Sequence, residues 1–284
     1  MQHKPVLGID IGGTNIRAGI VNNFKIEKLA SIQINNKDSE EKVFKDLIKV
    51  VNEVMTDQIT AIGIGVPSVV DTHAGIVYDV QNIPSWKEVA IAQRMKERYN
   101  LAVLVNNDAN CFALGEYHFG KGKGTKSMVG VTIGTGLGSG IIINGKLYCG
   151  PNCGAGEFGM IGYLDNVVEY YASGQFFTNV YNVDGRDVYE LAKEADSTAL
   201  KMFSEFGFHL GNAFKNILYA IDPDMIVIGG SLKNAWDFYS DAMQEHLNTF
   251  AFSRSVSNVQ IHLSELENCG VLGAAALHFD DILN

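Results

Sequence analysis

Near its start the chain reads Val6-Leu-Gly-Ile-Asp-Ile-Gly-Gly-Thr-Asn-Ile-Arg-Ala-Gly-Ile-Val21, and this stretch decides the fold. Two short apolar strands, Val6–Ile11 and Ile16–Val21, flank the turn Gly12–Asn15, which predicts a hairpin with a glycine turn. The same pattern returns 122 residues later: Gly130, Ile133, Gly134 and Ile142 match Gly8, Ile11, Gly12 and Ile20. Two similar halves joined near residue 120 indicate a duplication.

Outward from this hairpin, the chain alternates apolar strands with amphipathic helices, which predicts an α/β fold. The order of elements in the first half implies a largely parallel sheet with helices on its faces. In the first half we expect strands at 6–11, 16–21, 25–32, 62–66 and 102–106, and helices at 39–55, 86–99 and 108–119. In the second half we expect helices at 167–178, 186–195, 198–221, 233–250 and 270–279, and strands at 225–229 and 259–263.

Composition narrows the class of protein. The chain has 284 residues with 46% hydrophobic content, which excludes a disordered chain, a disulfide mini-scaffold and collagen. Its net charge of −10 shows no basic face, so we expect no nucleic-acid partner. No apolar run is long enough for a membrane helix, and no signal peptide precedes the first strand, so no membrane partner is expected. Four cysteines suggest a reduced interior, and a cytoplasmic location is expected.

The chain has thirty glycines but only five prolines, and the glycines cluster in turns. Neither a P-loop nor a Rossmann fingerprint fits their spacing, since Gly134–Gly140 alternates strictly and leads into another strand. Two turns remain, Asp10–Asn15 and Thr132–Gly136. They are either ordinary hairpins or two anion-binding turns that hold one polyphosphate through backbone N–H groups and threonine hydroxyls. In the second interpretation Asp10 supplies an oxygen ligand to Mg²⁺.

A second candidate segment is Asn107-Asp108, where an expected strand meets an expected helix. Asp108 is a good helix N-cap, and capping alone explains it structurally. Alternatively, a carboxylate at the carboxyl end of a parallel strand lies where open α/β sheets bind ligands. There it is able to accept the proton of an attacking hydroxyl in phosphoryl transfer.

Three further features have both a functional and a structural interpretation. Glu157 and Glu169, in a polar glycine-bearing stretch, are either ligands of sugar hydroxyls or surface acids. The segment Asp222–Ser231 is either an adenosine cradle or a plain β-turn-α junction. Cys149 and Cys153 form a C-x3-C pair without a second pair, and the seven histidines have no metal spacing, so no zinc site is expected.

Together these motifs resemble the sugar kinases of the ROK family, within the actin/hexokinase/Hsp70 superfamily, and the resemblance covers nearly the whole chain. Asp10–Asn15 resembles the first phosphate motif, and Ile133–Gly140 resembles the second. Asn107–Asn110 is similar to the segment with the catalytic aspartate, and Ala155–Gly159 resembles the sugar-binding signature. Ile226–Ser231 resembles the adenosine motif, and Gly270–Leu277 the final connecting helix.

The resemblance implies two ribonuclease-H-like domains of the actin-like ATPase type with a cleft between them. We expect a small domain of residues 1–119 completed by 270–284, and a larger one of residues 120–269. The implied activity is ATP- and Mg²⁺-dependent phosphorylation of a hexose such as glucose or an N-acetylhexosamine, by a homodimer. The resemblance implies that Asp108 is the base and a sugar contact and that Asp10 serves the metal. The implied phosphate-binding residues are Gly12, Gly13, Thr14, Asn15, Gly134, Thr135 and Gly136. The implied adenosine-binding residues are Gly229, Gly230 and Ser231, and the further implied sugar-binding residues are Asn82, Asn107, Glu157 and Glu169.

The chain departs from the family pattern after Gly159. Met160 replaces the signature histidine, and the shortened stretch 161–168 has no cysteine, so the family's structural zinc should be absent. These departures favour one alternative, a catalytically weak sugar sensor that belongs to the same family but has no DNA-binding domain. A second alternative is acyl-phosphate transfer of the acetate-kinase kind. The Glu157 and Glu169 pair favours a polyol over a carboxylate substrate.

Overall fold

The computed structural model describes residues 4–279, which divide into two compact units. Unit 1 takes the described residues up to Lys126, Gly140–Ala155 and those from Glu265 onward, whereas unit 2 takes Ser127–Ser139 and Gly156–Ser264. The functional domains expected at 1–119 with 270–284 and at 120–269 stay a prediction, and residues 280–284 lie outside the described part of the chain.

A five-stranded sheet in the order β3-β2-β1-β4-β8 forms the centre of unit 1. β2 pairs antiparallel with β1 and with β3, whereas β4 pairs parallel with β1 and with β8. The expectation of a largely parallel sheet is therefore wrong, because strands joined by short turns run antiparallel. The strands are β1 (Val6–Ile11), β2 (Asn15–Asn22), β3 (Lys25–Gln33), β4 (Ala61–Val66) and β8 (Ala102–Asn107).

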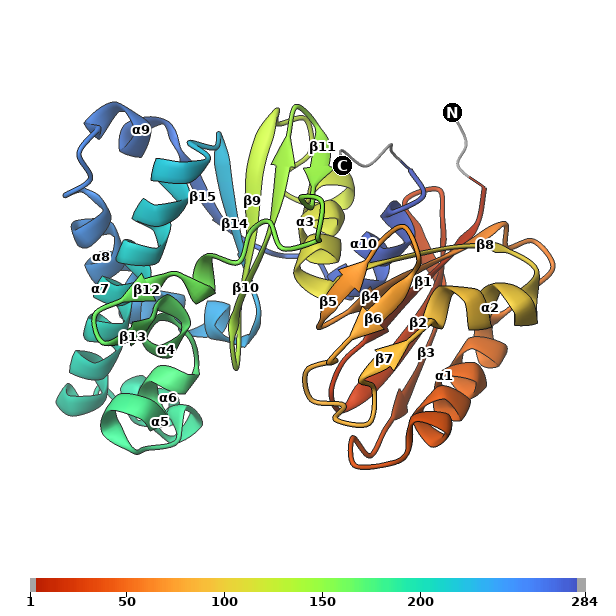
Figure 1. The fold of residues 1–284 in the computed structure, drawn as a ribbon. Coiled ribbons are helices and arrows are strands. Elements are labelled where there is room, and N and C mark those ends of the chain that lie inside the picture. The colour runs from red at the N-terminus through yellow and green to blue at the C-terminus, as the bar shows by residue number, and fades with distance from the viewer. Residues whose placement is uncertain (1–3, 280–284) are drawn as a thin grey trace. The chain divides into compact units, whose positions relative to one another are not determined.

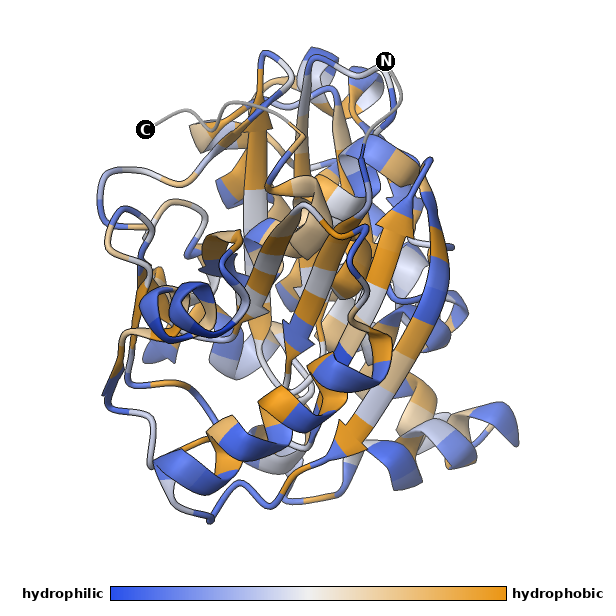
Figure 2. Ribbon diagram, turned by 90° about the vertical axis from the view of Figure 1, so that its right-hand side faces the viewer, coloured by the Kyte–Doolittle hydropathy of each residue, from blue (hydrophilic) through white to orange (hydrophobic). Residues whose placement is uncertain are grey.

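Four helices accompany this sheet, with α1 and α2 on one face and α3 and α10 on the other (Figure 1). They are α1 (Glu40–Val54), α2 (Ile91–Tyr99), α3 (Asp108–Phe119) and α10 (Cys269–Ala276). α1 follows from its sequence, because its buried residues Val43, Leu47, Val50 and Val54 recur at helical spacing. Figure 2 shows hydrophobic residues concentrated along the strands, whereas the helices carry both hydrophilic and hydrophobic residues.

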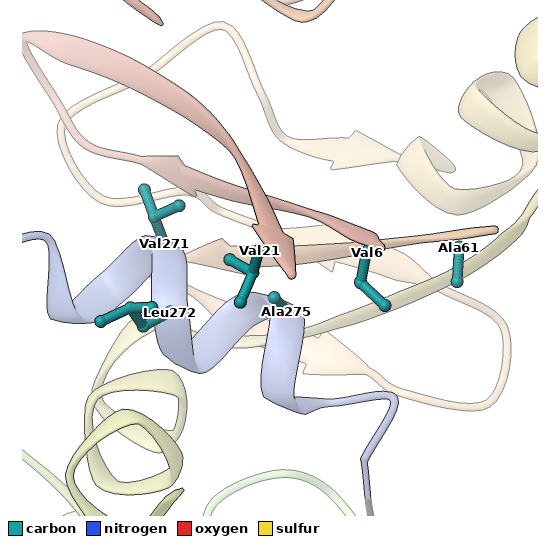
Figure 3. Close-up of a cluster of buried hydrophobic side chains, with 6 residues drawn as sticks. All are labelled: Val6, Val21, Ala61, Val271, Leu272 and Ala275. Carbon is teal, nitrogen blue, oxygen red and sulfur yellow. The ribbon is translucent and has the colours of Figure 1, made fainter. Parts of the chain in front are cut away.

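The helix α10 brings the end of the described chain back onto the first sheet. Val6, Val21 and Ala61 of the strands are buried against Val271, Leu272 and Ala275 of the helix (Figure 3). A Cβ on Gly63 of β4 would overlap the Ala274 carbonyl oxygen, so only glycine allows the helix to lie this close. The tight contact fixes α10 at the centre of unit 1.

A second five-stranded sheet has the order β11-β10-β9-β14-β15, which reproduces the first order strand for strand. β14 pairs parallel with β9 and with β15, as β4 does with β1 and β8. This equivalence is what the predicted repeat requires. The strands are β9 (Ser127–Ile133), β10 (Leu137–Ile143), β11 (Lys146–Tyr148), β14 (Met225–Gly229) and β15 (Gln260–Leu263).

Unit 2 also contains most of the helices of the second half. A long helix, α7, packs extensively against α8. The helices are α4 (Val168–Ala172), α5 (Gln175–Tyr181), α6 (Gly185–Lys193), α7 (Ser197–Ala220), α8 (Trp236–Leu247) and α9 (Ser253–Asn258), with 3₁₀ turns η1 (Phe158–Met160) and η2 (Ser231–Ala235). The helix expected at 233–250 is thus a 3₁₀ turn followed by α8. A short hairpin of β12 (Gly162–Tyr163) and β13 (Asn166–Val167) follows η1.

The helix expected at 86–99 is wrong over its first turn and begins only at Ile91. Trp86 is fully buried, and its carbonyl accepts the Val80 N–H. This contact keeps the segment extended, and the segment then joins a three-stranded antiparallel sheet that the sequence pattern did not indicate. That sheet consists of β5 (Val69–Asp71), β6 (Ile76–Tyr78) and β7 (Glu88–Val89).

Candidate functional site

In unit 1, the first glycine turn joins β1 to β2, and Asp10 lies just before it on β1. The Gly12 N–H donates to the Asn15 carbonyl at 2.9 Å, which closes the turn over Gly13 and Thr14. Burial raises the pKa of Asp10, and Arg17, whose guanidinium lies 3.9 Å from the carboxylate, lowers it in part. A partly desolvated carboxylate with an oxygen donor set fits a Mg²⁺ ligand, because a cation there would stabilise its charge.

The expected N-cap at Asp108 is wrong, because Asn107 caps α3 instead. Asn107 Oδ1 accepts hydrogen bonds from the N–H groups of Ala109 at 2.8 Å and Asn110 at 3.4 Å. Asp108 is the first helical residue, where its carboxylate also accepts the Ala109 N–H at 2.9 Å. The helix end is therefore satisfied by the neighbouring asparagine, and capping does not by itself account for an aspartate at 108.

Strand register brings the two acidic positions of unit 1 to the same end of the sheet. Asp10 of β1 is paired with Gly65 of β4, and Gly65 is paired with Asn106 of β8. Cys111 on α3 lies within the field of both carboxylates. Its pKa is raised far above its ordinary value, mainly by burial, then by Asp108 and by Asp10. The predicted metal ligand and the predicted base thus share one neighbourhood.

Two of the predicted sugar contacts also lie in unit 1. Asn82 is exposed and packs against the first turn, since a Cβ on Gly13 would overlap Asn82 Cβ. Asn107 uses its amide oxygen for the helix cap and donates from Nδ2 to the Ser68 carbonyl at 3.3 Å. Asn82 therefore lies beside the first glycine turn, and Asn107 lies beside Asp108, the predicted base.

In unit 2, the second glycine turn, Gly134–Gly136, is held by the residues that follow η1. Glu169 Oε2 accepts the Leu137 N–H at 2.7 Å and would lie 2.5 Å from a Cβ on Gly136. The helix expected at 167–178 is broken at Ser173-Gly174, which is a correction with a clear cause. Ser173 Oγ donates to the Thr135 carbonyl at 3.0 Å and the Gly174 N–H donates to the Gly134 carbonyl at 2.7 Å, and these bonds replace helix continuation.

Glu157 and Glu169, the predicted acid pair, interact electrostatically. Partial burial raises the pKa of Glu157, and the charge of Glu169 raises it further. Glu157 precedes the 3₁₀ turn that ends at Met160, whose side chain is 53% exposed. Gln175 Nε2 approaches the other Glu169 oxygen, Oε1, at 3.5 Å. Glu169 therefore contacts the second glycine turn and also interacts with Glu157, the other predicted sugar ligand.

A cavity of about 660 Å³ opens within unit 2 beside that turn. Gly134, Thr135 and Ser231 of the predicted phosphate and adenosine sets line it, whereas Gly229 ends β14 and Gly230 adopts a φ of 83° just before Ser231. Sequence reasoning missed the rest of its wall, because α5, α6 and the end of η2 carry no motif. That wall includes Gln175, Phe177, Arg186, Tyr189 and Asn234. Its apolar and polar sides suit a flat heterocycle with a polar appendage.

A model of the ROK family matches residues 6–281. The chain belongs to the ROK family. A glucokinase from Halalkalibacterium halodurans is 28% identical over 98% of this chain and 96% of that one. An N-acetyl-D-glucosamine kinase from Vibrio cholerae is 28% identical over 95% of this chain and 98% of that one.

Among solved structures, the ROK family glucokinase from Streptomyces griseus in complex with glucose and AMPPNP is 27% identical, with a TM-score of 0.81 over 96% of this chain and 98% of that one. The fold of this ROK protein is accordingly the mixed α/β fold of the actin-like ATPase type, and its homologues include sugar kinases. Within residues 4–279, no helix combines the length and apolar character needed to cross a membrane.

Proposed function

We propose that this ROK protein is an ATP-dependent sugar kinase that phosphorylates a hexose such as glucose or an N-acetylhexosamine. The observation that carries the proposal is the end of β8, where Asn107 caps α3 and leaves Asp108 at the carboxyl end of a parallel strand. Asp10 lies at the same end of the sheet on β1, separated from β8 by β4. Acidic groups in that position serve proton transfer and metal binding in phosphoryl transfer. The glucokinase and N-acetylglucosamine kinase homologues support the same assignment.

In the proposed mechanism, Asp108 accepts the proton of the attacking sugar hydroxyl. Backbone N–H groups of the two glycine turns, with the hydroxyls of Thr14 and Thr135, bind the phosphates of the nucleotide. Asp10 is the protein ligand of Mg²⁺, which when bound neutralises charge on the phosphate oxygens. The cavity beside Ser231 takes the adenosine, a role that the AMPPNP-bound relative supports.

Sugar recognition is assigned to Glu157 and Glu169 of unit 2 and to Asn82 and Asn107 of unit 1. The exposed Met160, where the family signature has histidine, gives an apolar surface that tolerates an N-acetyl group. We include a homodimer and a cytoplasmic location in the proposal, the latter supported by four cysteines that are all free thiols.

The test is a coupled ADP-release assay with ATP and Mg²⁺ against a panel of glucose, N-acetylglucosamine and N-acetylmannosamine, with acetate as a non-sugar acceptor. We expect sugar-dependent turnover with at least one hexose and none with acetate. ADP release with acetate alone would point to acyl-phosphate transfer. Sugar binding by calorimetry without ADP release for any hexose would overturn the kinase assignment and leave the sugar-sensor alternative.

A further inference from the structure

Two buried thiols of unit 1 lie directly behind the segment that carries the proposed base. Cys149 and Cys153 are 1% and 5% exposed and hydrogen-bond to each other. The turn between them is closed by the Cys153 N–H, which donates to the Gly150 carbonyl at 3.2 Å. The intervening Pro151 and Asn152 are exposed, so the thiol pair lies just beneath the surface.

Both sulfurs are bound to one fully buried amide, that of Asn106. Asn106 Nδ2 donates to Cys149 Sγ at 3.3 Å, and the Cys153 thiol donates to Asn106 Oδ1 at 3.3 Å. Asn110 Nδ2 lies 3.7 Å from each sulfur. Among the described residues, Asn110 Oδ1 is buried without a hydrogen-bond partner. The cluster is therefore not a fully satisfied structural network.

Asn106 connects this thiol pair to the end of β8. Its Oδ1 also accepts the Asn107 N–H at 2.8 Å and Asn110 Nδ2 at 2.9 Å. Asn107 in turn caps α3, so its position sets that of Asp108, the next residue. A covalent change at the sulfurs would remove two of the contacts that hold Asn106 and would loosen the cap.

The two thiols differ in acidity. The hydrogen bond from Cys149 lowers the pKa of Cys153, and backbone bonds from Asn107 and Val70 act in the same direction, whereas burial opposes them. The same pairing, together with burial, raises the pKa of Cys149. A thiol pair with one acidic member and one resolving member is the arrangement found in oxidation-sensitive sites.

We propose that Cys149 and Cys153 form a reversible oxidation site for hydroperoxides, and that the disulfide between them slows the kinase. The Cys153 thiolate attacks a peroxide oxygen, the O–O bond breaks, and hydroxide or alkoxide leaves to give a sulfenic acid. Cys149 sulfur then attacks Cys153 sulfur. The S–S bond forms as the S–O bond breaks, and water leaves with the Cys149 proton. Two electrons pass from the thiols to the peroxide, and an added dithiol reverses the reaction.

The first test is independent of activity. The full-length protein is treated with hydrogen peroxide, and its thiols are mapped by mass spectrometry after denaturation. We expect a Cys149–Cys153 disulfide, seen as the loss of two hydrogens. Cys111, which is fully buried, and Cys269, whose thiol donates to the Phe112 carbonyl, should stay reduced as internal controls. Oxidation confined to Cys111 or Cys269, or no disulfide at all, would overturn the proposal.

The second test, which rests on the proposed function, follows kcat before and after oxidation. We expect a loss of roughly 10- to 100-fold that dithiothreitol restores, since displacements of about 1 Å near a reacting group have effects of this size. Cys153→Ser is the matched control, because its hydroxyl keeps a donor for Asn106 Oδ1, and it should keep basal activity and resist peroxide. Cys153→Gly should resist peroxide as well, and glycine freely adopts the φ of 55° at this position.

These outcomes separate the two proposals. A disulfide that forms without changing kcat refutes the regulatory effect, and equal peroxide sensitivity in Cys153→Gly refutes the site. Absence of kinase activity before oxidation counts against the proposed function only, because the thiol map is still readable.

Discussion

The two five-stranded sheets share one strand order but differ at their strand ends. In the first sheet, Asp10 is the last but one residue of β1, just before the glycine turn, whereas the position 122 residues later in β9 is Thr132. The first sheet's last strand, β8, runs into Asn107 and Asp108, whereas the equivalent strand β15 is followed by Ser264 and Glu265. The two carboxylates proposed for metal binding and for proton transfer therefore both belong to one copy of the repeat.

In the second copy, residues that follow the turn instead hold the turn in place and line a cavity. Glu169, Ser173 and Gly174 all bond to the segment 134–137, and the cavity of about 660 Å³ lies next to it. The difference shows that equal topology supplies two glycine turns, while the chemical differences between the copies come from residues outside the repeated strands. Substitutions at a residue of one copy and at its counterpart or neighbour should therefore differ in their effects on the rate.

The largest effect is expected for Asp108→Asn, because it removes the proposed base without altering the helix cap at Asn107. We expect kcat to fall by roughly 10²- to 10⁴-fold, the usual range for a general base, with sugar affinity nearly unchanged by calorimetry. The matched control is Glu265→Gln at the equivalent strand end. Glu265 is 78% exposed and paired with Lys121, so its loss should leave kcat almost unaltered. A kcat for Asp108→Asn within about tenfold of the unmodified protein would refute the assignment.

Asp10→Asn should have the next largest effect, since it removes the carboxylate proposed to hold Mg²⁺. We expect kcat/KM to fall by roughly 100-fold and the Mg²⁺ concentration for half-maximal rate to rise. Thr132→Val at the matched position of the second sheet changes a hydroxyl that donates to the Gly138 carbonyl at 3.4 Å. It should alter the rate only slightly and leave Mg²⁺ dependence unchanged. Equal Mg²⁺ dependence in both variants would show that the two turns are not specialised in this way.

Glu169→Gln tests whether an acid of unit 2 acts on both substrates. Its carboxylate accepts the Leu137 N–H at 2.7 Å, and loss of such a charge-assisted bond should raise KM for ATP by between about 10- and 100-fold. Glu157→Gln, the neighbouring acid, should raise KM for the sugar but not for ATP. Steady-state kinetics with each substrate varied in turn make the distinction. A change confined to the sugar KM in Glu169→Gln would mean that the second turn does not depend on this carboxylate.

The repeated strands and several helices were predictable from sequence because their patterns are local. β1, β14 and α3 begin and end at the expected residues, since apolar runs there stop at glycine or polar residues. Residues 86–90 were misread because Trp86 and Val89 have helical spacing but are buried in extended segments. The break at Ser173-Gly174 depends on carbonyls some forty residues away in the chain, which no local pattern indicates.

The candidate site was predictable to the extent that glycine turns and acidic strand ends have recognisable sequences. Thr135 and Ser231 line the same cavity, and their roles as phosphate and adenosine contacts stay predictions. Arg186 and Tyr189 were missed because they lie on α6, an amphipathic helix whose exposed residues have no distinguishing pattern. The cap at Asn107 was assigned to its neighbour, since either side chain fits the N-cap preference and only geometry separates them.

Met160→His should change substrate preference rather than overall rate. The side chain is 53% exposed at the end of η1, three residues after Glu157. Replacing an apolar surface by a hydrogen-bonding ring should favour glucose over N-acetylhexosamines by up to about tenfold in kcat/KM. Met160→Leu is the control and should keep the original preference. An unchanged ratio in Met160→His would place the specificity elsewhere in unit 2.

The smallest expected effect compares one histidine of each unit. Burial lowers the pKa of His278 in unit 1 and of His209 in unit 2, against the opposing hydrogen bond with the Ile62 carbonyl and the opposing charge of Glu205, respectively. The unfolded chain then binds more protons than the native state below the ordinary histidine pKa of 6.5. Stability is therefore fully present above that pH and is lost as the pH falls through it.

Thermal unfolding between about pH 7.5 and pH 5.5 measures this loss as a fall in Tm. His278→Gln and His209→Gln should each flatten the fall, and the double variant should flatten it by the sum of the two. The residues belong to separate units, and their rings bond to different groups, the Ile62 carbonyl and the Tyr163 hydroxyl. A steeper fall in either variant would mean that the histidine is protonated in the native state, which reverses the sign of its contribution.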